Sequence, residues 1–348
     1  MRADALQVSA IGTPIAGPLA TRAEWADAGA GWRMFQDGRL HQVAHGLFCP
    51  PELAADPQAL ARALMERCPV DAVLGGWAAA YVHGARDAGP TMVTRTPQRV
   101  LVYYGRHEHK RPPGFTVRRS DLSVSETIQL GGLLLTSGPR TAYDMARFAD
   151  SLPQAVGILD CFCSELNTEP VELAAISELL ATHPRYRGNP TVRAAIDLAS
   201  SRARSFAEST VRARWTIDAG VPADSLLVNA TLRFAGAEFE LDLVDLSAGL
   251  VIEYDGPHHA SSDQRSRDAA KDFAATALGL ARTRLNAREL RLTRAGFERL
   301  AADRRTVAIS AGAPARAAAL VASGELAERP LKSFTRGGFT TDNEPRAV

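Results

Sequence analysis

The chain of 348 residues contains little cysteine and almost no excess of charge of either sign. Its cysteines, Cys49, Cys68, Cys161 and Cys163, are irregularly spaced, which excludes a disulfide framework and suits a reducing cytoplasm. The pair Cys161 and Cys163 lacks the spacing of a zinc ribbon, so we expect two buried helical thiols there. With 40 basic and 39 acidic residues, the net charge of +1 argues neither for nor against nucleic acid as a partner.

Long apolar runs are also missing. No charged segment followed by an apolar stretch indicates a signal peptide, and no run reaches transmembrane length. We therefore expect a cytoplasmic protein without a membrane partner. A composition of 46% hydrophobic and 23% charged residues is that of a globular protein, and the length predicts two or three domains.

Two strand-like runs, 238–245 and 250–259, are the most informative part of the sequence. In both runs apolar residues are dense and polar residues recur at alternate positions. With Ser247-Ala-Gly249 in the connection, they predict a hairpin in which Asp245 lies opposite Leu250.

This register gathers carboxylates. It places Asp242 opposite Glu253, and Asp255 shares a face with Glu253 because side chains alternate along a strand. Like charges about 5 Å apart across a strand pair are destabilising, and a hard divalent cation turns such repulsion into coordination. The alternative is that these acids mark the solvent face of an edge hairpin. His258 and His259 follow within four residues and favour a site.

A helix expected over 206–219 adds a further acid. Glu208, Val211 and Trp215 lie on one face of this helix, so Glu208 points toward the core. A carboxylate facing inward must be paired, hydrogen-bonded or bound to a metal ion. We expect the neighbouring arginines to line the outside of the helix with positive charge: Arg202, Arg204, Arg212 and Arg214.

The rest of this region predicts a mixed sheet flanked by helices. After the hairpin we expect a helix over 261–278, which contains Arg267 and Lys271, a strand over 280–285 and a helix from Ala287. From about Ser323 the chain is rich in glycine, proline and charge, which predicts a disordered tail.

The N-terminal region predicts a helix-turn-helix followed by a β-wing. Thr21 and Glu24 form a capping box for a helix that ends near Ala28, and a second short helix spans 32–36. A ribbon over 39–48 then completes the pattern of a winged helix. The alternative is a small helical cap, and residues 1–17 show no periodicity.

The middle region alternates helices and strands and contains the strongest basic cluster. We expect helices over 53–67, 72–82, 141–150, 153–166, 169–182 and 189–201, and strands over 99–104, 115–118 and 133–136. The cluster consists of Arg99, Arg106, Lys110, Arg111, Arg118 and Arg119. It predicts a surface that follows a phosphate backbone, and a merely solvated loop is the alternative.

Residues 200–292 resemble a branch of the PD-(D/E)XK nuclease superfamily that is similar to very-short-patch-repair (Vsr) endonucleases. The matching positions are Glu208, Asp242, Glu253-x-Asp255-Gly, His259, Arg267-Asp268 and Lys271. The resemblance implies that Glu208, Asp242 and Glu253 surround Mg²⁺ (or Mn²⁺) and that the domain cuts a phosphodiester.

One position departs from the superfamily pattern. The lysine that usually follows the second acid by two residues is Asp255 in this chain. Its roles would pass to His259, His258, Lys271 or a second metal ion, and His259 is the candidate general base. The branch itself commonly has aspartate there, so the departure does not mark an inactive enzyme.

The first 200 residues resemble AbiEi-type antitoxin and regulator proteins, which are abundant in actinobacteria. The landmarks are the helix-turn-helix with its wing, the stretch Gly75–Gly84, and Leu135-Thr-Ser-Gly-Pro-Arg-Thr-Ala142. This resemblance implies DNA binding, together with a toxin or repair protein as a partner.

The sequence thus predicts an α+β multidomain protein. The expected parts are a winged helix-turn-helix at 1–52, an α+β middle domain at 53–199, a restriction-endonuclease-like mixed α/β sheet at 200–310 and a disordered tail at 323–348. The expected function is a metal-dependent DNA endonuclease or nickase without a nucleotide cofactor. Alternatives are a DNA-binding regulator or antitoxin with a non-catalytic nuclease-like domain, and a partner-interaction module.

Two sets of residues follow from this function. The expected catalytic residues are Asp242, Glu253, Asp255, His259 and Lys271, with Glu208 as a further metal ligand. The expected DNA-binding residues are Arg33, Arg39, Arg99, Arg106, Lys110, Arg111, Arg118, Arg119, Arg212 and Arg267.

Overall fold

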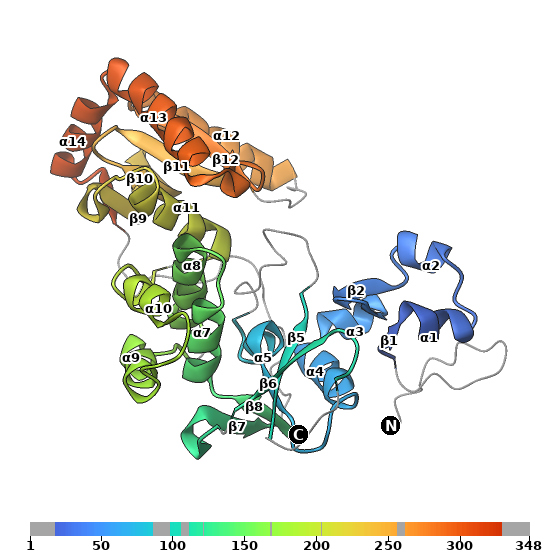
Figure 1. Cartoon of the computed structure of the whole chain (residues 1–348). Coiled ribbons are helices and arrows are strands. Elements are labelled where there is room, and N and C mark those ends of the chain that lie inside the picture. Colours follow the sequence, from blue (N-terminus) through green and yellow to red (C-terminus); the bar gives the residue numbers. More distant parts are fainter. Residues whose placement is uncertain are drawn as a thin grey trace, which may run out of the picture. The chain divides into compact units, whose positions relative to one another are not determined.

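The computed structural model describes residues 18–85, 98–105, 111–120, 122–167, 169–202, 204–255 and 262–328. The protein is α+β and divides into two compact units (Figure 1). Unit 1 comprises Met1–Asp150 and Glu172–Arg193, and unit 2 comprises Ser151–Val171 and Ala194–Val348. Residues 1–17 and 329–348, for which we predicted a loose segment and a disordered tail, lie outside the described ranges.

The N-terminal part of unit 1 is a three-stranded antiparallel sheet with two short helices. Its elements are β1 (Ala20–Thr21), α1 (Arg22–Asp27), α2 (Arg33–Gln36), β2 (His41–Ala44) and β3 (Leu47–Cys49), and the strand order is β1-β3-β2. The predicted capping box is confirmed: the Thr21 side chain accepts from the Glu24 N–H, and Glu24 accepts from the Thr21 N–H. The predicted ribbon over 39–48 is confirmed as β2 and β3.

A five-stranded mixed sheet forms the centre of unit 1, in the order β6-β5-β4-β8-β7. Its strands are β4 (Val73–Gly75), β5 (Val100–Tyr104), β6 (Phe115–Arg119), β7 (Thr127–Leu130) and β8 (Leu133–Thr136). The helices of this part of the chain are α3 (Pro51–Ala55), α4 (Pro57–Met65), α5 (Gly76–Val82), α7 (Gly138–Arg147), α9 (Leu173–Thr182) and α10 (Asn189–Ile196).

Two predicted helices of this region are wrong in part. The helix expected over 53–67 is two helices, because Asp56 caps α4 through the N–H groups of Gln58 and Ala59. The helix expected over 72–82 begins with strand β4, which is central in the sheet and pairs with both β5 and β8. Sheet pairing between distant segments overrides the local helical pattern there.

The two units do not follow the predicted domain boundaries. Leu47 and Cys49 of the N-terminal ribbon share one buried core with Leu64 and Leu74, so residues before 53 pack with the segment that follows. Helix α8 (Leu152–Cys163), which we assigned to the middle domain, belongs to unit 2 and packs against α11 (Phe206–Ile217).

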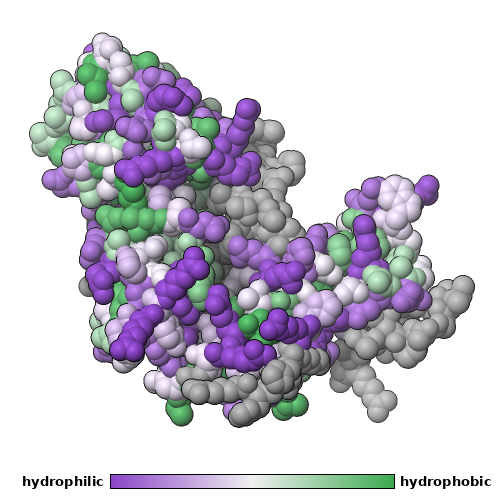
Figure 2. All heavy atoms as spheres, in the orientation of Figure 1, coloured by the Kyte–Doolittle hydropathy of each residue, from purple (hydrophilic) through white to green (hydrophobic). Residues whose placement is uncertain are grey.

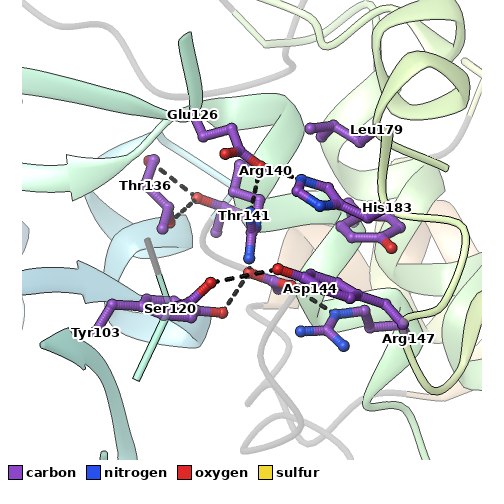
Figure 3. A network of polar contacts seen from close by, with 12 residues as sticks. Tyr103, Ser120, Glu126, Thr136, Arg140, Thr141, Asp144, Arg147, Leu179 and His183 are labelled. Carbon is purple, nitrogen blue, oxygen red and sulfur yellow. Dashed lines mark hydrogen bonds and ion pairs between the residues drawn. The ribbon is translucent and has the colours of Figure 1, made fainter. Parts of the chain in front are cut away.

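A buried polar network ties unit 1 together around Arg140 (Figure 3). The Arg140 side chain is fully buried and forms ion pairs with Glu126 and, at 2.7 Å, with Asp144. Asp144 also accepts hydrogen bonds from the Tyr103 hydroxyl and from Arg147, and Glu126 contacts His183 Nε2 at 2.5 Å. The network therefore connects β5, α7 and the C-terminal end of α9.

The Glu126 carboxylate of this network is ionised because of its partners. Burial opposes the charge of Glu126, but hydrogen bonds from the Ser123 N–H and His183, with the Arg140 charge, lower its pKa to about 2. A pKa that is lower in the folded state contributes stability above the unfolded value, and this is lost only as the pH falls toward 2.

Unit 2 contains a second five-stranded mixed sheet, in the order β12-β11-β10-β9-β13. Its strands are β9 (Leu226–Phe234), β10 (Ala237–Asp245), β11 (Leu250–Asp255), β12 (Ala281–Asn286) and β13 (Leu326–Glu328). The predicted hairpin register is confirmed from Asp245, opposite Leu250, to Leu243, opposite Ile252; the paired residues end one position before the predicted pair of Asp242 and Glu253. Only β11 and β12 are parallel among these strand pairs in the described chain.

Helices cover both faces of this sheet, as predicted (Figure 1). Trp215 of α11 and Phe297 of α13 (Arg294–Ser310) pack with Ile252 on one face. The other face packs against α12 (Ser262–Ala277) and α14 (Ala313–Ser323), where Leu320 lies beside Val251. The sheet is therefore the middle layer of unit 2.

Three parts of unit 2 differ from the sequence predictions. We did not predict β9, although it pairs with β10 from Ala237 to Asp245, with an interruption at Asp242. The expected tail contributes β13, because Leu326 is fully buried opposite Leu232. The helix expected from Ala287 begins only at Arg294, since a short 3₁₀ turn precedes it and Thr293 caps it.

Polar side chains cover much of each unit on the face shown in Figure 2. Within the described ranges, no single helix is both long and apolar enough to cross a lipid bilayer. Helices α13 and α14 meet that criterion only when taken together as a bent pair.

Arg140→Met should destabilise unit 1 by about 3–5 kcal/mol, because Glu126 and Asp144 would remain buried without the Arg140 charge that both of them contact. Urea unfolding followed by circular dichroism measures this loss. Arg193→Met, at an exposed position on α10, is the matched control and should change stability by less than about 0.5 kcal/mol. Equal losses for the two variants would show that the network does not stabilise the unit.

Candidate functional site

The candidate site lies where β10 changes the face that its side chains occupy. Leu241 and Leu243, two residues apart, pack in different core clusters, so the strand alternation breaks at Asp242. Opposite Asp242 the β9–β10 ladder is interrupted at Asn229, which is buried and has the left-handed φ of 51°. The Asp242 carboxylate instead accepts the Tyr254 N–H of β11 at 3.1 Å.

Asn229 also connects this break to the segment before α11. Its side-chain N–H donates to the Arg202 carbonyl at 2.5 Å, and its Oδ1 atom is buried without a hydrogen-bond partner. The same hydrogen bond stabilises the strained conformation of Asn229 and positions the segment that leads into α11. We did not predict Asn229 as part of the site, and an asparagine within a strand pattern was the only signal.

Glu208 faces inward at the start of α11, as predicted. Ser205 caps the helix by accepting the Glu208 N–H at 3.2 Å, and its hydroxyl donates to Glu208 Oε1 at 2.9 Å. The second carboxylate oxygen, Oε2, is buried without a hydrogen-bond partner. Burial, followed by the charge of Asp242, raises the pKa of Glu208 to about 8.

Asp242 is the central acid of the cluster. Burial raises its pKa to about 6 although the Lys271 charge and the Tyr254 N–H oppose the shift, and the charges of Glu253 and Glu240 add to it. Glu240 was not among the predicted residues, yet it lies two positions before Asp242 on β10 and forms an ion pair with Arg204. The acids predicted from distant segments therefore do converge.

Glu253 is held by cations. Its side chain is 6% exposed and forms ion pairs with Lys271 of α12, with Arg282 of β12 at 2.5 Å, and with Arg284 at 3.6 Å. Arg282 and Arg284 also contact Asp272, so the cations form a network on one side of Glu253. Lys271 is thus brought to the cluster, as the resemblance implied, and its partner there is a carboxylate.

The donor set fits a divalent cation in part. Glu208 and Asp242 present buried carboxylates with raised pKa values, one with a free oxygen, and hard cations prefer such ligands. In the described part of the chain, no three His, Cys, Asp or Glu side chains are arranged to hold a metal ion as they stand. The expected third ligand, Glu253, is engaged by Lys271 and Arg282.

Of the other predicted site residues, Asp255 and Arg267 lie in the described part of the chain. Asp255 is exposed and lies opposite Asn286 of β12. His258 and His259 fall outside the described residues, so the candidate general base stays a prediction. Arg267 is exposed on α12, as a DNA contact requires.

The prediction that Arg212 and Arg214 line the outside of α11 is wrong. Arg212 is 9% exposed and donates to the buried Asp160 of α8 at 2.7 Å. Arg214 is buried and donates to Asp218 and to the Leu290 carbonyl. Both faces of α11 are covered, because α8 packs against the face that turns away from the sheet.

The predicted basic residues of unit 1 that the structure describes are at the surface. Arg33, Arg39, Arg99, Arg111, Arg118 and Arg119 are exposed, whereas Arg106 and Lys110 lie outside the described ranges. Arg39 forms an ion pair with Asp37 at 2.8 Å. Arg118 stacks over the Phe148 ring at 4.3 Å. Arg118 and Arg119 alternate on the edge strand β6, so they point to opposite faces of the sheet.

No protein-family model matches the chain, and no curated protein is similar to it in sequence. The functional assignment therefore rests on the residues of the candidate site.

Glu208→Gln should stabilise the metal-free protein at pH 8 and leave it nearly unchanged at pH 4.5. The raised pKa means that the folded state binds the proton more tightly, so stability falls as the pH rises from about 4.5 to about 8. An amide removes this loss, and we expect a gain of at least about 1 kcal/mol at pH 8, the value of one pKa unit.

Thermal unfolding in the presence of EDTA, at the two pH values, measures this gain. Glu298→Gln on the exposed face of α13 is the control and should show no such pH dependence. A Glu208→Gln protein that is less stable than the wild type at pH 8 would contradict the assigned electrostatics.

Proposed function

We propose that the protein is a cytoplasmic, metal-dependent DNA endonuclease or nickase. The observation that supports this most strongly is the pair of buried, mutually repelling carboxylates of Glu208 and Asp242 with Lys271 close enough to act on Asp242. Such groups are costly to bury and are typical of sites that bind a cation. Glu253 lies next to them, held by Lys271.

The arrangement of both units supports the finer fold assignments that we propose. In unit 2 the order α11-β9-β10-β11-α12-β12 places the acids on the first helix and on two central strands, as in restriction-endonuclease-like sheets. In unit 1 the sheet order β1-β3-β2, with two helices between β1 and β2, is compatible with a winged helix-turn-helix.

Glu208 and Asp242 would hold Mg²⁺ or Mn²⁺, and Glu253 would join them when it is released from its ion pairs. A bound cation would lower the pKa of a water molecule and offset negative charge on the phosphate in the transition state. Lys271 would bind the scissile phosphate, and the contact of its ammonium with Glu253 supports this role. It would take the part of the lysine that Asp255 replaces, and His259 remains the proposed general base.

The duplex would be held by exposed basic side chains. We propose Arg33, Arg39, Arg99, Arg106, Lys110, Arg111, Arg118, Arg119 and Arg267 for this role, without the buried Arg212. Each neutralised phosphate adds affinity that falls with salt concentration.

Asp242→Asn and Glu253→Gln should each reduce DNA cleavage by more than about 100-fold, because even residues behind the ligands of a metal contribute 10–100-fold. The assay combines purified protein with Mg²⁺ or Mn²⁺ and supercoiled, mismatched and single-stranded DNA. Glu298→Gln, which changes charge equally on the surface of unit 2, should cleave as the wild type does. Wild-type protein that leaves all three substrates intact would refute the nuclease.

A second candidate function is a DNA-binding regulator or antitoxin in which unit 2 is a scaffold. The observation that favours it is the charge compensation of Glu253 by Lys271, Arg282 and Arg284, which lets this part of the sheet persist without a metal ion. Under this hypothesis the partner is a toxin or a repair protein.

The regulator predicts DNA binding that survives Asp242→Ala and Glu253→Ala unchanged, with no cleavage. Replacing Arg33 and Arg39 together by alanine should weaken binding and lower its salt dependence by about two phosphate contacts. Fluorescence anisotropy with labelled duplexes over a range of salt concentrations measures both effects. A protein without affinity for DNA even at low salt would support a partner-interaction module instead.

A further inference from the structure

The Glu253 carboxylate cannot bind a metal ion and keep its present ion pairs at the same time. The proposed function requires its carboxylate as a ligand of a divalent cation. In the structure the same carboxylate contacts Lys271 through Oε1 and Arg282 through Oε2, and Arg284 approaches Oε2 at 3.6 Å. Its side chain is only 6% exposed, so it cannot simply turn into water.

Removing one partner from a buried ion pair is strongly destabilising when nothing replaces it. Glu253 can therefore leave Lys271 and Arg282 only if another cation arrives at the same time. Lys271 and Arg282 in turn need an anion to replace the carboxylate. The exchange must involve both a cation and an anion.

The surroundings of Arg282 suit such an exchange. Its Nη2 atom contacts Glu253 at 2.5 Å while its Nη1 atom contacts Asp272 of α12. Asp272 can hold the guanidinium after the contact with Glu253 is broken. Because burial is outweighed by Arg282 and Arg284, the pKa of Asp272 is lowered, which keeps this second anchor ionised.

Three cationic side chains gathered at this point could receive an incoming anion. Lys271, Arg282 and Arg284 surround Glu253, two of them also contact Asp272, and Lys271 acts on Asp242 as well. Arg284 is 47% exposed, so the network reaches the solvent at this point. Guanidinium groups bind phosphate with the same paired geometry that they use for carboxylates.

We propose that a DNA phosphate takes Lys271 and Arg282 from Glu253 and thereby releases Glu253 to bind the divalent cation. Until the substrate is present, Lys271 and Arg282 neutralise Glu253 in place of the metal ion. DNA and the cation then bind cooperatively, and each raises the affinity for the other by the same factor. The inference deepens the proposed nuclease function and rests on it.

The test measures Mn²⁺ affinity of the full-length protein by isothermal titration calorimetry, with and without a nuclease-resistant phosphorothioate duplex. For the wild type we expect the duplex to tighten Mn²⁺ binding by about 5–150-fold, the usual range of coupling between two sites. Arg282→Gln should bind Mn²⁺ more tightly than the wild type without DNA, and the duplex should then add less.

Arg288→Gln is the matched control, because it removes an equal charge from an exposed position in the same part of unit 2. It should leave both the Mn²⁺ affinity and its coupling to DNA unchanged. Lys271→Gln is a second variant in case Arg282→Gln does not fold, and it should show the same gain in Mn²⁺ affinity. Arg282→Lys, which keeps the charge, should restore part of the coupling.

The outcomes separate this inference from the proposed function. Equal Mn²⁺ affinity with and without the duplex, or variants that bind Mn²⁺ no more tightly than Arg288→Gln, would overturn the exchange. If such a wild-type protein still cleaves DNA, the nuclease assignment stands. Failure of every protein to bind Mn²⁺ would overturn the exchange, and the cleavage assay then decides the function by itself.

Discussion

A buried carboxylate needs a cation, a proton or several hydrogen bonds, and this requirement organises both units. In unit 1, Arg140 compensates Glu126 and Asp144 together. In unit 2, Arg212 compensates Asp160, and Arg305 lies 2.9 Å from the buried Asp245. These pairs connect helices to helices and strands, so they contribute to the unique packing of each unit.

Glu208 and Asp242 meet the requirement differently. Glu208 has one oxygen without a hydrogen-bond partner, and repulsion within the cluster adds to burial in raising both pKa values. The fold therefore stores an unfavourable electrostatic interaction at one place in unit 2. The left-handed conformation of Asn229 lies in the same place, opposite Asp242. Strain and unfavourable charge that coincide are characteristic of functional sites.

The ion pairs of Glu253 explain how the fold accommodates this acid beside Asp242. Lys271 and Arg282 come from α12 and β12, which follow the hairpin in sequence and bring positive charge to the edge of the acidic group. Lys271 therefore brings an ammonium group to the acids from a helix that lies outside the hairpin.

Much of the local structure could be predicted from the sequence. The alternation of apolar and polar residues, with a short loop, determined the hairpin register that puts Asp245 opposite Leu250. The capping box of Thr21 and Glu24 was visible as a spacing of three residues, and helical periodicity showed that Glu208 faces inward. These features depend on residues that are close in sequence, where periodicity and capping are decisive.

Only the tertiary structure decided which charges meet. Arg212 is buried because α8 packs on α11. Its partner Asp160 lies 52 positions earlier in the chain. Leu326 is a strand residue because it pairs with Leu232 of β9. The partners of Glu253 and the break of β10 at Asp242 likewise depend on contacts between distant segments. A sequence pattern shows that an acid is buried, but the residue that compensates it is set by packing in three dimensions.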